Sequence, residues 1–279
     1  MGIPAVLRGR PALLVVAHPG HELRVHGWLE RARPEVWVLT DGGGRTGIGR
    51  LDSSRTVIER AGAGVGPVFG AFTDREAYRF LLLGEVEPVA RLVERLADRL
   101  AAEESIYVVG DAFEGFNPIH DLCRVTVDLA AARAELLTGR RIDSFDFPLE
   151  AAPDTLGEIG GDLRLLLDEA AVARKVAAAR AYQEMAAEVD RALAGHGEVA
   201  FAVERLRPVD ALRPLAARLH GPPLYERFGE DRVAAGTYRE VLRFAEHFAP
   251  FVAGLAGALG DSGERGVLAG GGSGAQKNS

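Results

Sequence analysis

Short runs of consecutive apolar residues alternate with longer amphipathic segments through the first half of the chain. Three runs are mostly apolar and end at a turn, which is typical of strands buried on both faces: residues 11–17, 35–40 and 106–109. The segments between them carry apolar side chains at helical spacing, and we predict helices at residues 21–33, 55–63, 85–104 and 119–137. This alternation predicts an α/β fold with a mostly parallel sheet and helices on both faces.

The pattern changes after residue 150. Residues 168–193 and 237–259 predict helices, the second kinked at Pro250, whereas residues 198–205 fit either a strand or a helix. We read this half as a mainly helical region packed on the sheet. We therefore divide the chain into a sheet domain at residues 1–150, a helical region at 151–260 and a disordered tail at 261–279.

Composition narrows the classes of function. The net charge of −7 does not indicate a basic surface that could bind nucleic acid, and it disfavours binding to an anionic membrane. The one cysteine, Cys123, excludes an internal disulfide framework and a multi-cysteine zinc module. No apolar stretch approaches the roughly 20 residues of a spanning helix, and the start of the chain does not read as a signal peptide. We expect a soluble cytoplasmic protein.

Three of the seven histidines follow predicted strands. His18 and His21 come after the first strand, and His120 lies in the segment after the third. Because the loops after parallel strands gather at one edge of the sheet, we expect these side chains to lie close together. Three neutral imidazoles with an open fourth position suit a catalytic zinc, which lowers the pKa of its bound water to about 7. Histidines that are hydrogen-bonded within the core are the alternative, and the spacing alone leaves both open.

The residues around these histidines resemble motifs of the PIG-L/LmbE family of zinc-dependent N-deacetylases. Ala17-His-Pro-Gly-His-Glu22 is similar to the family's Ala-His-Pro-Asp-Asp-Glu, and Asn117-Pro-Ile-His120 to its His-Pro-Asp-His. Residues 38–43 resemble its second strand with a Thr-x-Gly turn, and residues 55–66 its arginine-bearing helix. The motifs occur in the family's order and fall within residues 10–150.

The resemblance implies a Rossmann-like metal-binding catalytic domain and a C-terminal region that covers the substrate cleft. It implies a hydrolase that removes an acyl group from an N-acylated amino sugar or a related small metabolite. The implied metal ligands are His18, His21 and His120, with His21 in place of an aspartate of the family. We expect zinc, although three imidazoles also accept iron or another first-row divalent metal. The expected partner is a sugar-like small molecule, and a homo-oligomer is left open.

Two reacting residues of the family are missing. Gly20 stands where the family has its general base, an aspartate, and Asn117 stands where it has a histidine that helps to stabilise the oxyanion. Asn117 can still donate a hydrogen bond to an oxyanion. Asp111 and Glu114 lie on the loop that could supply another base, with turn capping and simple solvation as the alternatives.

Three further residues are candidates for supporting roles. Glu22 and Asp121 each follow a candidate ligand, so each can orient an imidazole or cap a helix. Arg55 loosely matches the family arginine that contacts the sugar, and an exposed helix arginine is the alternative. A metal-binding protein that has lost deacetylation is our second functional hypothesis. A nucleotide-binding protein is disfavoured, because the strand-linked Gly-x-Gly-x-x-Gly spacing is missing.

Overall fold

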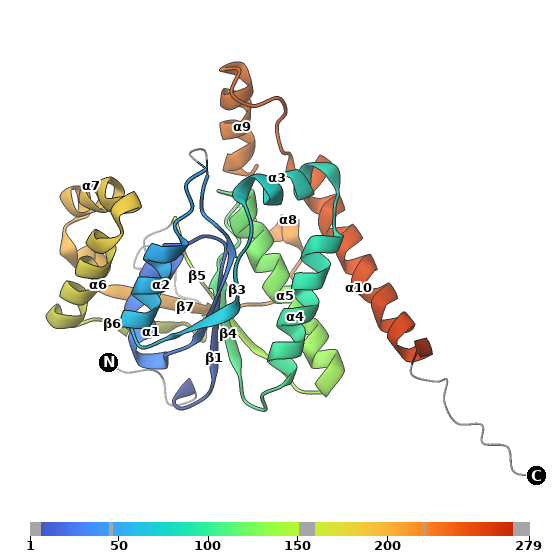
Figure 1. Ribbon diagram of the computed structural model, residues 1–279, viewed down its shortest axis with the longest axis horizontal. Coiled ribbons are helices and arrows are strands. Elements are labelled where there is room, and N and C mark those ends of the chain that lie inside the picture. Colours follow the sequence, from blue (N-terminus) through green and yellow to red (C-terminus); the bar gives the residue numbers. More distant parts are fainter. Residues whose placement is uncertain (1–6, 45–46, 151–159, 212, 220, 270–279) are drawn as a thin grey trace, which may run out of the picture.

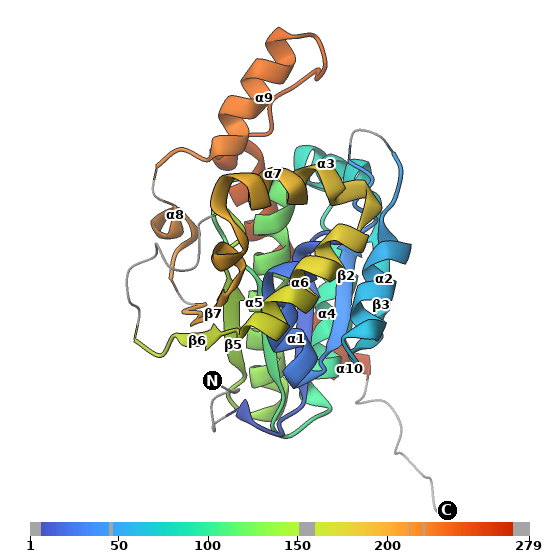
Figure 2. The same cartoon turned by 90° about the vertical axis from the view of Figure 1, so that its left-hand side faces the viewer.

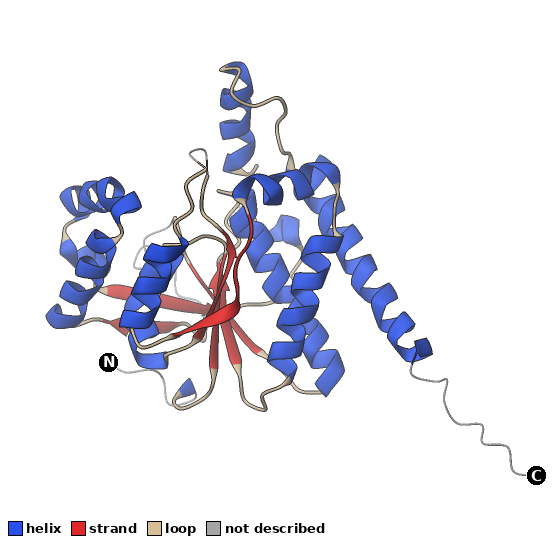
Figure 3. Ribbon diagram, in the orientation of Figure 1, coloured by secondary structure: helices blue, strands red, loops and turns tan. Residues whose placement is uncertain are grey.

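The computed structural model describes residues 7–44, 47–150, 160–211, 213–219 and 221–269. Its centre is a seven-stranded sheet in the order β3-β2-β1-β4-β5-β7-β6, with helices on both sides (Figure 3). The first five strands run parallel, and β7 is antiparallel to both β5 and β6. The predicted fold class is therefore confirmed. The strands are β1 Ala12–Val16, β2 Glu35–Thr40, β3 Gly64–Phe72, β4 Tyr107–Asp111, β5 Asp143–Phe147, β6 Leu163–Leu166 and β7 Val203–Pro208.

Alternate side chains of β1 enter two different cores, because successive side chains of a strand point to opposite faces. Leu13 and Val15 belong to the core under the helices on one side of the sheet, and Leu14 and Val16 to the core on the other side. The first side carries α3 (Asp74–Leu83), α4 (Glu87–Ala101), α5 (Pro118–Thr138) and α10 (Ala249–Ala269). The second carries α1 (His26–Ala32) and α2 (Leu51–Arg60), seen on the left in Figure 1.

Several predicted elements have different bounds in the structure. The predicted strands correspond to β1, β2 and β4, and the predicted helices at residues 85–104 and 119–137 to α4 and α5. The helix predicted at residues 21–33 is instead a 3-10 turn, η2 (His21–Val25), followed by α1. Strand β3 was missed because its glycines and proline interrupt the apolar pattern, and β5 because aspartate and serine alternate with phenylalanine.

The C-terminal region is mainly helical, but it also completes the sheet. The segment that fitted either a strand or a helix contains both: η4 (Glu198–Phe201) is followed by β7, which pairs with β5. The sheet therefore extends beyond the predicted boundary at residue 150. The remaining elements are α6 (Glu169–Ala181), η3 (Gln183–Met185), α7 (Ala186–His196), α8 (Leu215–Arg218), α9 (Leu224–Ala234) and a π-helical turn, η5 (Phe244–Phe248).

The helix predicted at residues 237–259 has different bounds in the structure. Its helical part begins at Phe244 and is divided into η5 and α10, with Pro250 in the first turn of α10. Helix α10 is assigned through Ala269 and so enters the segment predicted as a disordered tail, and the disorder of that segment stays a prediction. Residues 270–279 of the predicted tail lie outside the described part of the chain.

Helix α6 lies against α1, on the outside of the second helical layer (Figure 2). Helix α9 stands apart above the sheet in both views, with its first residue bound through its backbone N–H to the carbonyl oxygen of Gly115. Within the described residues, no helix has the length and apolar character needed to cross a membrane.

Candidate functional site

The three candidate histidines meet at the carboxyl ends of β1 and β4. These neighbouring strands are the switch point of the sheet, because the chain leaves β1 toward β2 and leaves β4 toward β5, on opposite sides. His18 follows β1, His21 begins η2, and His120 lies in the first turn of α5. Their rings meet edge to face, with centres 5.2 Å apart for His18 and His21, 5.0 Å for His18 and His120, and 4.6 Å for His21 and His120. We call these three side chains the histidine cluster.

Two contacts fix the ring of His18. Its Nδ1 lies 2.8 Å from Thr40 Oγ1, and the Thr40 hydroxyl donates its own proton to the carbonyl oxygen of Ala17. The Nδ1 of His18 is therefore the donor, and its Nε2 keeps a free lone pair. A carboxylate oxygen of Asp74, at the start of α3, lies 3.1 Å from the same Nδ1.

A carboxylate fixes the ring of His21 in the same manner. His21 Nδ1 lies 2.8 Å from Asp111 Oδ2, which also accepts the backbone N–H of Ala17. Asp111 is fully buried, and burial raises the pKa of its carboxyl to about 6. Burial, reinforced by the neighbouring imidazoles, holds the pKa of His21 and of His120 well below the usual range. Both rings are therefore neutral at physiological pH, as metal ligands must be.

Buried polar atoms without a partner gather around these rings. Native interiors leave few such atoms, and an ion or water between them is an ordinary explanation. Within the described residues, His120 Nδ1, Asp111 Oδ1 and Asp74 Oδ1 have no hydrogen-bond partner, and neither has Arg50 Nε, whose side chain is close enough to affect His21 electrostatically.

The fit to a metal ion is good in spacing and incomplete in orientation. Nitrogen ligands about 2.1 Å from a tetrahedral zinc place their ring centres about 5 Å apart, which matches the histidine cluster. Yet no group of three or more His, Cys, Asp or Glu side chains in the described part of the chain is arranged to hold a metal ion as it stands. The kind of donor and the spacing of the ring centres therefore fit a metal ion, whereas the nitrogens as they stand do not converge on one point.

The two predicted bases have other partners in the structure. Asp111 orients His21 through Oδ2, as described above. Glu114 Oε2 accepts the backbone N–H groups of Leu149 and Glu150, at 3.0 and 3.2 Å, so it ties its loop to the segment after β5. Each carboxylate therefore commits one oxygen to structural partners, and for Asp111 the other oxygen, Oδ1, has no partner among the described residues.

Asn117 caps helix α5 at the edge of the site. Its side-chain oxygen accepts the backbone N–H of Ile119 at 2.9 Å. This bond orients the amide, and the amide nitrogen has no hydrogen-bond partner among the described residues. Asn117 therefore keeps the donor that its predicted role as an oxyanion stabiliser requires.

Glu22 and Asp121 hold backbone loops and do not contact the imidazoles. Glu22 is fully buried, and its two oxygens accept the Gly20 backbone N–H at 2.7 Å and the Ser54 hydroxyl at 2.8 Å. Asp121 Oδ1 accepts the backbone N–H groups of residues 114 and 115, and burial raises the pKa of its carboxyl to about 7. The carboxylates that do orient imidazoles, Asp111 and Asp74, are different ones.

Two arginines that sequence reasoning missed, Arg24 and Arg50, are close enough to His21 for their charge to lower the pKa of that imidazole. Arg55, the predicted sugar contact, is exposed and lies over the Phe69 ring at 4.9 Å. The charge of Arg50 also opposes the burial that raises the pKa of Glu22. Arg50 precedes α2 in a glycine-rich loop without periodicity, so its position offered only a weak signal.

Gly20 lies between the two N-terminal histidines in a conformation that favours glycine, with φ of 105°. A Cβ atom added there would lie 2.5 Å from Met185 Sδ and 3.9 Å from the Tyr182 ring. A side chain at position 20 would therefore require the end of the Met185 side chain to move and would be strained at this positive φ.

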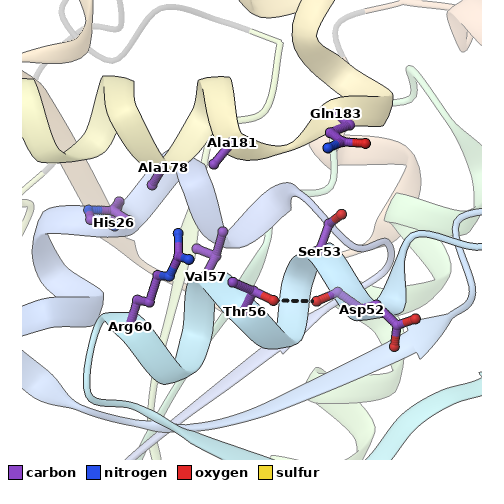
Figure 4. Close-up of a pocket in the computed structure, with 9 residues that line it drawn as sticks. All are labelled: His26, Asp52, Ser53, Thr56, Val57, Arg60, Ala178, Ala181 and Gln183. Atoms are coloured by element: carbon purple, nitrogen blue, oxygen red, sulfur yellow. Dashed lines mark hydrogen bonds between the residues drawn. The ribbon is translucent and has the colours of Figure 1, made fainter.

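A separate open pocket of about 380 Å³ lies between α2 and the end of α6 (Figure 4). None of the three clustered histidines lines it, so we place the candidate site at the strand ends. The residues that line the pocket are His26, Asp52, Ser53, Thr56, Val57, Arg60, Ala178, Ala181 and Gln183.

Comparison with known proteins gives a structural likeness. No protein-family model and no curated protein matches the chain. A triple mutant of a deacetylase involved in the teicoplanin biosynthetic pathway matches with a TM-score of 0.51 and 14% identity, over 71% of this chain and 97% of that chain. The conserved protein TT1542 from Thermus thermophilus gives 0.46 and 21%, over 71% and 96%. The zinc-inhibited form of teicoplanin deacetylase Orf2 gives 0.44 and 13%, over 71% and 97%. At this identity, the first likeness shows a shared fold.

Proposed function

We propose that the protein is a metal-dependent hydrolase that removes an acyl group from an N-acylated amino sugar or a related small metabolite. The observation that carries the proposal is the histidine cluster at the switch point of the sheet, with Nδ1 of His18 and of His21 each bonded to a fixed acceptor. Metal-binding histidines are oriented in this way in many proteins. The fold shared with a teicoplanin deacetylase supports amide hydrolysis as the reaction.

Zinc is the metal that we propose, with iron or another first-row divalent metal as the alternative, since neutral imidazoles accept all of these. When bound, such a metal polarises an amide carbonyl and lowers the pKa of a water molecule. His18, His21 and His120 would hold it. Thr40 and Asp111 would keep the first two rings in their present tautomers.

Other residues of the chain would act on the substrate. The amide nitrogen of Asn117 would donate a hydrogen bond to the oxyanion that forms from the amide carbonyl. Its oxygen stays bonded to the Ile119 backbone N–H, so the donor is already oriented. The positive charge of Arg50 lies on the same edge and favours an anionic transition state.

A second candidate is a metal-binding protein without hydrolytic activity. It is favoured by the engagement of both predicted bases, because Asp111 binds His21 and Glu114 binds backbone N–H groups. The position of Gly20, which the resemblance identifies with the general base, has a positive φ and faces the Met185 side chain, and both disfavour a carboxylate there. The two candidates share the metal site and differ in turnover.

Metal analysis of the purified protein tests the site that both candidates share. We expect one metal ion per chain in the wild type and its loss in His120→Ala. His247→Ala is the matched control, because His247 lies in η5 and bonds the Arg243 backbone N–H. A wild type without stoichiometric metal contradicts both candidates.

Release of primary amine from a panel of N-acetylated amino sugars separates the two candidates. We expect turnover by the metal-loaded wild type, and a loss of about 10²-fold in kcat for Asn117→Ser, which keeps a helix cap and withdraws the amide donor. Unchanged kcat in this variant would contradict the role of Asn117. A metal-loaded protein that releases no amine from any member of the panel favours the second candidate.

A further inference from the structure

The C-terminal region contributes one side chain to the immediate surroundings of Gly20. Met185 ends η3, and its sulfur lies 2.5 Å from the point that a Cβ of residue 20 would occupy. Gly20 is the second residue after His18 and directly precedes His21. The Met185 thioether therefore packs against the loop that carries His18 and His21.

Contacts of the residues that precede Met185 hold it in place. Tyr182 is fully buried, and its hydroxyl donates to the carbonyl oxygen of Arg50 at 3.3 Å. Glu184 accepts the Ser53 hydroxyl at 2.8 Å. The Met185 backbone N–H donates to the Tyr182 carbonyl oxygen at 3.0 Å. The segment is thus anchored to the start of α2, and Figure 4 shows Gln183 near Ser53 in this contact.

The chemistry of this wall differs from that of the rest of the site. A thioether is apolar, flexible and a weak hydrogen-bond acceptor, so it takes no proton from water. The Tyr182 ring adds a second apolar surface within 3.9 Å of the same point. By contrast, acidic, hydroxyl and imidazole groups surround the other sides of the histidine cluster.

We propose that Met185 determines which ligands reach the histidine cluster. Its side chain closes the space beside Gly20, limits the length of an acyl group that fits there, and makes this wall apolar and non-basic. The site then accepts a short uncharged acyl group such as acetyl. The proposed selectivity for short acyl groups rests on the proposed function. The proposal that Met185 fills the space beside Gly20 does not depend on that function.

Melting temperatures of the metal-free protein test the occupation of this space. We expect Gly20→Ala to lower the Tm by roughly 5 °C, through overlap with Met185 and through strain at positive φ. In a Met185→Ala background, Gly20→Ala should lower the Tm by at most about half as much, because the backbone strain remains and the overlap with Met185 is gone. Leu193→Ala is the matched background, because Leu193 packs in the same helical cluster but does not approach Gly20. Equal costs in the two backgrounds would overturn the proposal.

Ligand titration of the cobalt(II)-loaded protein tests the selectivity through its visible absorption. Met185→Ala should bind hexanoate at least about tenfold more tightly than the wild type, because the opened space accepts apolar carbons. Acetate affinity should be unchanged, and Met185→Leu, which keeps the volume, should retain the wild-type preference. Equal changes for acetate and hexanoate, or none, would overturn the selectivity. If the wild type takes up no cobalt, the proposed function and the selectivity both fail, while the melting temperatures still decide whether Met185 fills the space.

Discussion

Two buried polar clusters lie close together in this protein, and only one of them is complete. The first is centred on Glu204 of β7, which is 1% exposed. One oxygen of Glu204 accepts the Gly27 backbone N–H and the Lys175 ammonium, and the other accepts the Trp28 backbone N–H. Lys175 also donates to the carbonyl oxygen of Arg24. Every oxygen of this carboxylate therefore has a donor, and the cluster joins β7, α6 and α1.

The histidine cluster is different, because His120 Nδ1 and Asp111 Oδ1 are buried without partners among the described residues. A buried polar group stabilises the fold only when it is hydrogen-bonded. An unpaired one destabilises it, because no hydrogen bond offsets the free energy lost on removing the group from water. The comparison indicates that the Glu204 cluster stabilises the packing of the C-terminal region, whereas the unpaired atoms of the histidine cluster support the ligand site that we propose. Three predictions test this contrast.

The largest effect should come from Glu204→Ala. The change leaves the Lys175 ammonium buried and uncompensated, so we expect the free energy of unfolding to fall by about 3–5 kcal/mol in urea denaturation. The metal content of the folded fraction should stay at the wild-type level. If the variant loses metal at urea concentrations at which it is still folded, then metal binding at the histidine cluster depends on the Glu204 cluster.

A smaller effect should come from Asp111→Asn. The variant keeps the shape of the side chain but weakens the acceptor of His21 Nδ1–H, so we expect metal affinity to fall by about 10–100-fold in competition with a chromophoric chelator. Asp121→Asn is the matched control, because Asp121 bonds backbone N–H groups and touches no imidazole. Equal losses in the two variants would contradict the assignment of Asp111 as the residue that orients His21.

The strands that carry the site could be predicted from sequence because their buried positions form uninterrupted apolar runs. β1 and β4 are such runs, and the rule that loops gather at the carboxyl ends of parallel strands then brings His18 and His120 together. Strand β3 could not be found in this way, since glycine and proline break its pattern and pairing with β2 supplies its stability. Strand β7 was ambiguous because its apolar positions are shared with buried charges such as Glu204 and Arg205.

Proximity in sequence was a poor guide to the partners of the histidines. Glu22 and Asp121 are neighbours of ligands along the chain, yet the imidazoles are bound by Thr40, Asp111 and Asp74 from three different elements. His21 and Glu22 lie in a 3-10 turn and His120 and Asp121 in a helix, where successive side chains point about 100–120° apart, so the residue next to a histidine faces away from the other imidazoles. Met185 could not have been inferred at all, because its position depends on how α6 packs across the sheet domain.

The smallest effects distinguish two arginines that the sequence did not separate. Arg55→Ala should lower the free energy of unfolding by about 0.5 kcal/mol, because it removes an exposed contact with the Phe69 ring. The affinity of the cobalt(II)-loaded protein for acetate should stay unchanged. Arg50→Met keeps the aliphatic stem and removes the charge beside His21, so acetate should bind about threefold more weakly. The shift for Arg50→Met should shrink at high salt, since a partly exposed charge is screened. A larger effect of Arg55→Ala on acetate affinity would mean that the anion reaches the site across α2. The unpartnered nitrogen of Arg50 would then have no part in ligand binding at the histidine cluster.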